Sequence, residues 1–421
     1  MPRLSCLLAV ALVLAAGGAA RAQDPPAAAQ EGPPPAPLVA RPEGVAVTTL
    51  AAPDAFTTPG RDTGLPATLW RGASAQTAKT VLPLLAAKPL SPAAAALARR
   101  VLATGAPGPR GASDDPALAA ARANALMFQG DPKAAAAVLA RAPGVDRNAD
   151  LARAAAESLL LSGDDKRACQ LAEALSVGRD ETYWLKLRTY CQAIAGQTAQ
   201  AQLTFDLVQA QVKDPTFARL MGAKLAGVGN PGAASLRNGL DYALSRSLGL
   251  DLATAKPSPA VAAALAGADP APPVLDPSAA APDVSPLAEA LARGEPIRDA
   301  AMAALVDAAA STEPKARARG QAALLLALAV SGASTPEARG LMAGLSVPEG
   351  KAPLGRDLAL EAAGAQKLMG EAALLALWTC AEAGPAGPAM GDRVRIVRAL
   401  QAAGLEADAR AFALEGLVAL R

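Results

Sequence analysis

Two cysteines near the middle of the chain, Cys169 and Cys191, are spaced for a disulfide. Cys169 falls on the second helix of one expected helical hairpin and Cys191 on the first helix of the next. Such helices are expected to be antiparallel neighbours, and the bridge would close a loop of about 20 residues, which stabilises by about 3 kcal/mol in the chain-entropy model. The alternative is two small buried apolar side chains. Cys380 is left over on an apolar helix, either as an inert buried thiol or as a redox or intermolecular one.

A second candidate site is an aromatic helix in a chain with only 3% aromatic residues. Tyr183, Trp184, Arg188 and Tyr190 all lie within eight positions. Tyr, Trp and Arg are the residue types that dominate binding hot spots. We therefore predict that Tyr183, Arg188 and Tyr190 form a partner-binding surface on the concave side of a helical array. The alternative is that these rings fill gaps between alanine-rich helices.

The absence of histidine restricts the chemistry of the whole chain. It excludes Ser-His-Asp and Cys-His catalysis and histidine-ligated zinc. No phosphate-binding loop or dinucleotide-binding motif is visible. The carboxylate pairs Asp114–Asp115 and Asp164–Asp165 fall in turns, where aspartate normally caps a helix. We therefore predict no catalytic, metal-binding or cofactor-binding residues, with catalysis by carboxylates alone as the remaining enzymatic alternative.

The helices that hold these cysteines and aromatic residues are predicted from glycines that recur every 33 residues. Gly130, Gly163, Gly196 and Gly229 each follow an amphipathic stretch, and most are followed by another. This period is typical of a helix-turn-helix solenoid, whose units bury their apolar faces by stacking. The composition is rich in alanine and leucine, which favour helix, and poor in β-branched and aromatic residues.

One of these units resembles a known repeat family. The segment Gly163–Leu175 is similar to the second half of a tetratricopeptide repeat, with the small residues Ala134 or Ala135, Ala168 and Ala201 at matching positions after the turns. The period here is 33 residues against 34 in the family, and large residues of the first helix are mostly replaced by Ala or Leu. The resemblance implies a degenerate tetratricopeptide-like α-solenoid. Independently of the resemblance, the repeat pattern predicts a degenerate second helix of the fourth unit at about residues 235–248.

A wider resemblance covers scattered motifs around Trp70, Leu97–Leu102, Tyr183–Cys191 and Leu400–Arg410. They resemble exported alphaproteobacterial proteins often labelled "antifreeze glycopeptide polyprotein". An antifreeze glycopeptide needs tandem Ala-Ala-Thr units, and no such tandem occurs here. The resemblance therefore implies a grouping and not an activity.

The first residues predict the compartment. Residues 1–22 have a basic start, an apolar run and an Ala-x-Ala end, which predict a secretory signal peptide cleaved after Ala22 and a periplasmic protein. No later stretch reaches 18 apolar residues, so no transmembrane segment is expected after cleavage. A net charge of +2 without long single-sign runs gives no indication of nucleic-acid binding.

The chain is thus expected to be all-α, a tetratricopeptide-like α-solenoid of stacked hairpins with a disordered Pro/Ala-rich N-terminus. The expected divisions are a signal peptide (1–22), a Pro/Ala-rich disordered linker (23–66), a helical repeat domain (67–255), a Pro/Ala-rich linker or long loop (256–286) and a C-terminal helical repeat domain (287–421).

The expected function is a non-catalytic periplasmic scaffold that binds envelope proteins. Exported helical superhelices also resemble the non-catalytic part of soluble lytic transglycosylases and activators of wall synthases. The alternative is therefore an accessory peptidoglycan-associated or wall-enzyme-regulating module without a catalytic domain of its own. A purely structural role in the envelope is a further alternative.

Overall fold

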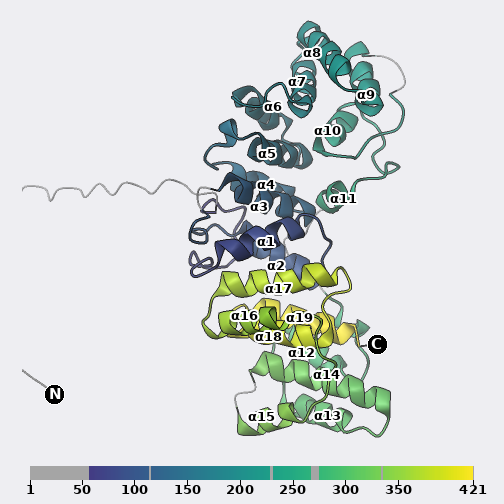
Figure 1. The fold of residues 1–421 in the computed structure, drawn as a ribbon. Coiled ribbons are helices and arrows are strands. Elements are labelled where there is room, and N and C mark those ends of the chain that lie inside the picture. The colour runs from purple at the N-terminus through teal and green to yellow at the C-terminus, as the bar shows by residue number, and fades with distance from the viewer. Residues whose placement is uncertain (1–55, 113–114, 228–230, 267–274, 333–334, 421) are drawn as a thin grey trace, which may run out of the picture. The chain divides into compact units, whose positions relative to one another are not determined.

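The computed structural model describes residues 56–112, 115–227, 231–266, 275–332 and 335–420, all within one compact unit. These residues form nineteen α-helices and two short 3-10 helices, and they contain no β-strand (Figure 1). The all-α expectation is confirmed for this part of the chain. The predicted signal peptide, most of the predicted N-terminal linker and Gly229 lie outside the described residues.

The first block of helices runs up to residue 265. Its elements are α1 (Ala75–Leu85), α2 (Pro92–Ala103), α3 (Pro116–Phe128), α4 (Pro132–Leu139), η1 (Val145–Arg147), α5 (Ala149–Ser162), α6 (Asp165–Ala174), α7 (Thr182–Ile194), α8 (Thr198–Gln211), α9 (Pro215–Ala226), α10 (Gly239–Ser247) and α11 (Pro259–Leu265).

The second block begins after residue 276. Its elements are η2 (Pro277–Ala279), α12 (Ser285–Arg293), α13 (Asp299–Ala309), α14 (Pro314–Ser331), α15 (Pro336–Ala343), α16 (Leu354–Ala365), α17 (Met369–Ala383), α18 (Met390–Ala403) and α19 (Glu406–Val418).

The recurring glycines separate consecutive helices. Gly130, Gly163 and Gly196 all adopt positive φ angles of 75–88°, a left-handed conformation that costs glycine little. Asp131 and Asp164 directly follow two of them, and each side chain accepts a hydrogen bond from a backbone N–H in the first turn of the next helix. A glycine that ends one helix and an aspartate that starts the next therefore make each of these two turns.

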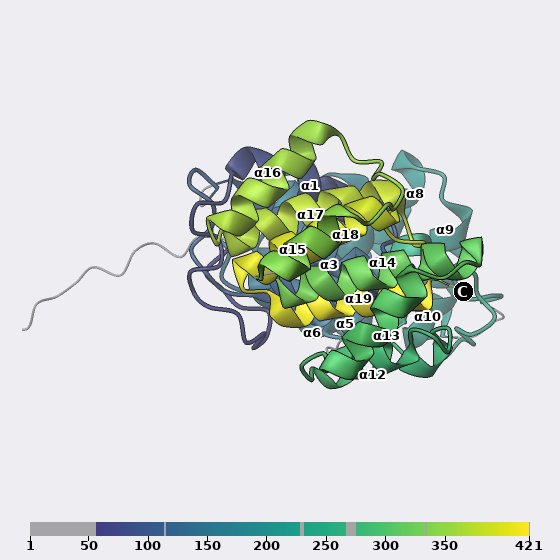
Figure 2. The same cartoon turned by 90° about the horizontal axis from the view of Figure 1, so that it is seen from below.

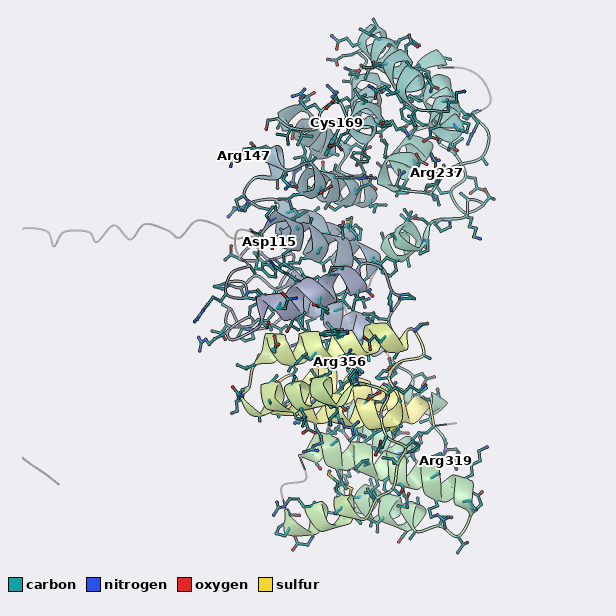
Figure 3. The ribbon with its side chains drawn as sticks, viewed as in Figure 1. Asp115, Arg147, Cys169, Arg237, Arg319 and Arg356 are labelled. Atoms are coloured by element: carbon teal, nitrogen blue, oxygen red, sulfur yellow. A yellow bond between two sulfur atoms is a disulfide. The ribbon has the colours of Figure 1, made fainter. Side chains whose placement is uncertain are left out.

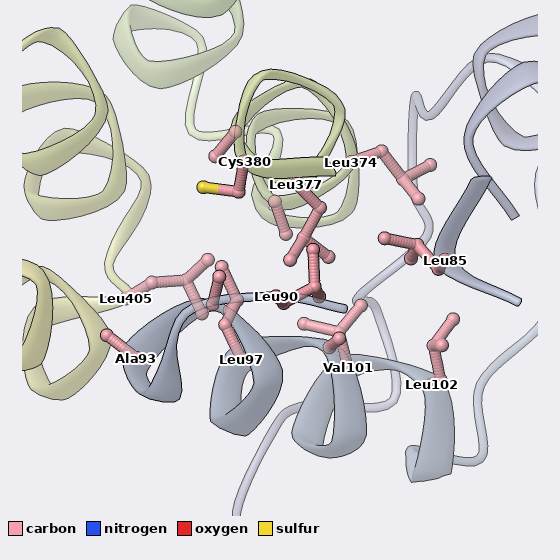
Figure 4. Close-up of a cluster of buried hydrophobic side chains, with 14 of the residues drawn as sticks. Leu85, Leu90, Ala93, Leu97, Val101, Leu102, Leu374, Leu377, Cys380 and Leu405 are labelled. Carbon is pink, nitrogen blue, oxygen red and sulfur yellow. The ribbon is translucent and has the colours of Figure 1, made fainter. Parts of the chain in front are cut away.

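The two blocks meet through their alanine- and leucine-rich faces. α17 contacts α1 and α2, and α19 also contacts α2. Figure 4 shows this junction, where Leu97 and Val101 of α2 lie opposite Leu377 of α17. The last helical hairpin, α18–α19, does not end the stack. It lies between the first helices and α14, because α19 contacts α2 and both helices contact α14.

The core also reaches into stretches predicted as linkers. Phe56 is fully buried and meets Trp70 edge to face, with ring centroids 5.6 Å apart. The guanidinium of Arg122 lies 5.0 Å from the centroid of the Phe56 ring. The packed part of the chain therefore begins before residue 66. Within the predicted 256–286 linker, α11 contacts α3 and α5.

Buried side chains form two clusters. The smaller core consists of buried residues of α5–α10 together with Ala136 and Leu175. The larger core comprises buried residues of α1–α5, α11–α14 and α16–α19 and of the loops between them, and α15 packs against it with partly buried side chains.

Candidate functional site

The helix α7 carries all three residues that the sequence predicts for partner binding, and the structure buries them to different depths. Tyr183 and Arg188 are half-buried, whereas Tyr190 is 0% exposed. The structure corrects the expectation for Tyr190, because its ring is part of the smaller core and offers no surface to a partner.

Tyr183 is tied to α5 and α10 through one carboxylate. Its hydroxyl donates to Oε1 of Glu157 at 2.8 Å, and the backbone N–H of Gly239 donates to Oε2 of Glu157 at 2.6 Å. The guanidinium of Arg153 lies 4.6 Å from the centroid of the Tyr183 ring. Burial raises the pKa of Glu157, and burial together with the neighbouring Glu157 raises that of Tyr183. A carboxylate thus sits at the N-terminus of α10, where the helix dipole favours negative charge.

Tyr190 is tied to the other end of α10. Its hydroxyl donates to Oδ2 of Asp165 at 3.0 Å. The guanidinium of Arg246, in the last turn of α10, donates to both oxygens of the same carboxylate at 2.7 and 2.8 Å. Burial and the Asp165 charge raise the pKa of Tyr190. Both hydrogen bonds come from Nη2 of Arg246, and this charge-assisted contact holds the C-terminal end of α10 against α6 and α7.

The face of α7 that was expected to meet a partner is therefore occupied by the chain itself. α10 contacts α5 and α9, and its two ends are bonded to Glu157 and Asp165. From the repeat pattern we expected this segment to be the second helix of the fourth unit. It packs back across α5 instead, because its apolar Leu240 and Leu244 enter the smaller core.

A third set of charged contacts joins the loop before α10 to α7 through Asp214. Asp214 accepts from Nζ of Lys186 at 2.7 Å and from Nη2 of Arg237 at 3.1 Å. Arg237, labelled in Figure 3, also donates to the buried Asp241 at 2.6 Å. Burial alone would raise the pKa of Asp214, but the Lys186 and Arg237 contacts and the backbone N–H of Phe217 outweigh it and lower this pKa to about 2. Ion pairs thus connect α7, the residues just before α9 and α10 at the edge of the smaller core.

Arg188 has a different environment from the two tyrosines. Its guanidinium donates to the backbone carbonyl of Arg179, in the turn before α7, and its Nε is buried with no hydrogen-bond partner. Burial lowers the pKa of Arg188. Its role in partner binding stays a prediction.

No protein-family model, curated protein or solved structure matches this chain. The functional argument therefore depends on the chain's own residues.

The predicted disulfide is present. Cys169 on α6 and Cys191 on α7 are joined with their Cα atoms 5.5 Å apart, and Figure 3 locates Cys169 among the α6 side chains. Cys380 is a free thiol, fully buried on α17 (Figure 4). Burial raises its pKa, which keeps the thiol protonated and unreactive.

Two exposed leucine pairs were not predicted from the sequence. On α8, Leu203 and Leu207 are 74% and 48% exposed, and on α16, Leu354 and Leu358 are 72% and 58% exposed. Each pair is four residues apart and so lies on one helix face. Apolar residues occur on several sides of α8, so the helical period alone does not distinguish the outward face from the core face.

Two further findings on the described residues concern membrane spans and metal sites. None of their helices is long and apolar enough to cross a membrane. No group of three or more cysteine, aspartate or glutamate side chains in this part of the chain is placed to hold a metal ion.

Proposed function

We propose that the protein is a non-catalytic periplasmic scaffold of stacked tetratricopeptide-like hairpins that binds envelope proteins. The observation that carries this proposal is the pair of open leucine faces on α8 and α16. An apolar side chain three-quarters exposed loses the favourable free energy of burial that its neighbours gain. Paired leucines on a helix face are the kind of apolar contact that a partner protein covers.

The regular turns support the repeat architecture in this proposal. Left-handed glycines 33 residues apart join α3 to α4, α5 to α6 and α7 to α8, and the two helices of each pair pack against each other. A stack of this kind presents extended surfaces without a deep active-site cavity.

The disulfide supports the proposed periplasmic location. Disulfides persist in oxidising compartments, which include the bacterial periplasm. The Cys169–Cys191 bridge therefore fits export through the predicted signal peptide and cleavage after Ala22.

Capture from living cells tests the proposal with the full chain. The tagged protein and the variants Leu203→Ser/Leu207→Ser and Leu354→Ser/Leu358→Ser would be crosslinked in cells, captured and compared by quantitative mass spectrometry. Matched controls are Gln200→Ser on α8 and Ala359→Ser on α16, which change exposed positions without removing a leucine.

We expect a stoichiometric envelope protein with the wild type and the controls, and about tenfold less of it with at least one leucine variant, since hot-spot truncations cost at least 1–2 kcal/mol. Equal recovery with both double variants would contradict the proposal. Retention on purified peptidoglycan sacculi without a stoichiometric protein would favour the accessory cell-wall alternative.

A further inference from the structure

A groove between α14, α16 and α18 has the dimensions of a small-ligand site. Its volume is about 390 Å³, and most of its wall consists of alanine and glycine from the three helices. Both α14 and α16 pack against α18, so the walls belong to elements held in the larger core (Figures 1 and 2). Small-molecule sites typically start at about 300 Å³. The groove therefore has room for a molecule the size of a dipeptide or tripeptide, and its walls are held in place by the packing of α14 and α16 against α18.

The polar part of this groove consists of three side chains. Glu361 lies on the α16 wall, and Arg398 and Gln401 lie on the α18 wall. Arg398 and Gln401 are three residues apart on α18, so they occupy neighbouring positions on one helix face.

The two charges in the groove are not paired with each other. Glu361 and Arg398 line the same groove, yet within the described part of the chain neither forms an ion pair or a side-chain hydrogen bond. Nearby charges behave differently: on the same helix, Arg395 lies 3.3 Å from Asp357 and 3.8 Å from Asp392. The groove thus holds one available cation and one available anion on facing walls.

Gln401 adds an unsatisfied neutral group. Its Oε1 is buried and has no hydrogen-bond partner among the described residues. A buried amide oxygen without a donor is unfavourable, so a ligand that supplies an N–H gains from meeting it. The accessible groups are therefore a cation and an anion, and the Gln401 amide becomes an acceptor for a ligand N–H when its half-exposed side chain turns into the groove.

We propose that this groove binds a short zwitterionic peptide. The peptide carboxylate pairs with the Arg398 guanidinium, which matches carboxylate geometry in a two-pronged contact. The terminal ammonium pairs with Glu361, and the peptide N–H donates to Oε1 of Gln401. The alanine and glycine walls favour side chains no larger than a methyl group. None of the exposed leucines of α8 and α16 lines this groove, although Leu358 lies three residues before Glu361 on α16. Occupation of the groove does not depend on the scaffold role.

Calorimetric titration of the full chain with alanine dipeptides tests the groove. The probes are L-Ala-L-Ala and D-Ala-D-Ala, each also with an acetylated N-terminus or an amidated C-terminus. We expect saturable binding of at least one free dipeptide and about tenfold weaker binding when either end is blocked, because each blocked end leaves a charge unpaired.

Variants link the binding to the three side chains. Arg398→Gln, Glu361→Gln and Gln401→Leu should each weaken the free dipeptide by about tenfold. Arg317→Gln, an exposed arginine on α14 outside the groove, is the matched control and should bind like the wild type. Circular dichroism and the thermal midpoint of each variant separate lost binding from lost folding.

The chirality of the preferred dipeptide identifies its source. Preference for D-Ala-D-Ala supports a cell-wall peptide as ligand, and preference for L-Ala-L-Ala supports a protein-derived peptide. No saturable binding at millimolar dipeptide, equal binding of blocked peptides, or unchanged affinity in all three groove variants would overturn the proposal. None of these outcomes bears on capture through the leucine faces, so the two proposals fail separately.

Discussion

The two hydrophobic cores fill the space between helices by opposite means. The smaller core contains large rings: Trp184, Tyr190 and Phe217 are all buried at 1% exposure or less. In the larger core, helices of the second block approach until their backbones touch, and glycine marks the contacts. The chain is rich in alanine throughout, yet the two regions pack differently. In the smaller core, large rings fill the space between helices, whereas in the second block the helices approach so closely that little space is left.

The close approaches in the larger core can be measured at two glycines. A Cβ on Gly320 of α14 would lie 2.5 Å from the carbonyl carbon of Ala308 on α13. A Cβ on Gly364 of α16 would lie 2.9 Å from Cα of Ala399 on α18. Because backbone atoms cannot move aside as side chains do, even one added methyl group must separate these helices.

Both cores contain buried rings, with Phe56, Trp70 and Phe412 in the larger one, but in the smaller core the rings lie between consecutive helices. Its rings hold the helices apart, and buried tyrosine needs a partner for its hydroxyl, which Asp165 supplies to Tyr190. The ion pairs around α10 and the disulfide lie at the same place. We infer that the smaller core is sensitive to loss of large side chains and of charge, and the larger core to gain of volume.

The largest expected effect is the loss of a ring from the smaller core. Trp184→Ala should lower the free energy of unfolding by about 3–5 kcal/mol, because the cavity left by a fully buried indole cannot close completely. Urea denaturation followed by far-UV circular dichroism measures it.

Trp378→Ala is the matched control for this prediction. Trp378 is half-buried on α17, under the Arg356 guanidinium at 4.4 Å, and donates to Glu382 at 2.9 Å. Its loss should cost about 1 kcal/mol, since it removes a surface cation–π contact and one hydrogen bond. A cost for Trp184→Ala no larger than for Trp378→Ala would contradict the ring-filled description of the smaller core.

An intermediate effect is expected from adding a methyl group to the larger core. Gly320→Ala should destabilise the protein by about 1–3 kcal/mol, because the new Cβ meets the backbone of α13. Gly222→Ala on α9 is the control: no atom lies within 4 Å of its Cβ position, so the change should stabilise by up to about 1 kcal/mol through helix propensity. Urea midpoints of the two variants should move in opposite directions, and a shared direction would refute the backbone contact.

The smallest effect expected here depends on pH and on Asp214. Its folded pKa of about 2 lies below its ordinary value of 3.8, so its contribution is present above 3.8 and is lost as the pH falls through about 2. After allowance for solvent screening of these partly exposed ion pairs, Asp214→Asn should be less stable by about 1 kcal/mol at neutral pH, and the difference should vanish toward pH 2. Denaturant titrations from pH 7 downward measure this, and a pH-independent difference would assign the loss to shape instead of charge.

Asp408, in the larger core, has a raised pKa, whereas that of Asp214 is lowered. Burial raises its pKa despite the Arg100 ion pair, so the folded state binds its proton more readily than the unfolded state. Its contribution to stability therefore increases as the pH falls through the raised folded value. Acid should therefore destabilise the folded state through Asp214 but not through Asp408.

Local features of the fold were predictable from the sequence. The turns at Gly130, Gly163 and Gly196 and the aspartates after two of them depend only on residues within one helical turn. The Cys169–Cys191 bridge joins consecutive helices, so neighbouring helices in the chain were enough to predict it. The positions of Tyr183 and Arg188 on one helix followed from their spacing, but their surroundings did not.

What the sequence by itself determined was the helical period, the turns, the disulfide and the absence of histidine chemistry. The tertiary structure decided that α10 covers α5, that α17 joins the first helices, and that Glu361, Arg398 and Gln401 share a groove. The physical reason is that turn and cap signals are local, whereas alanine–leucine faces are nearly equivalent to one another. Which of these faces meet is settled by backbone approach and by a few long-range contacts, such as Arg246 with Asp165.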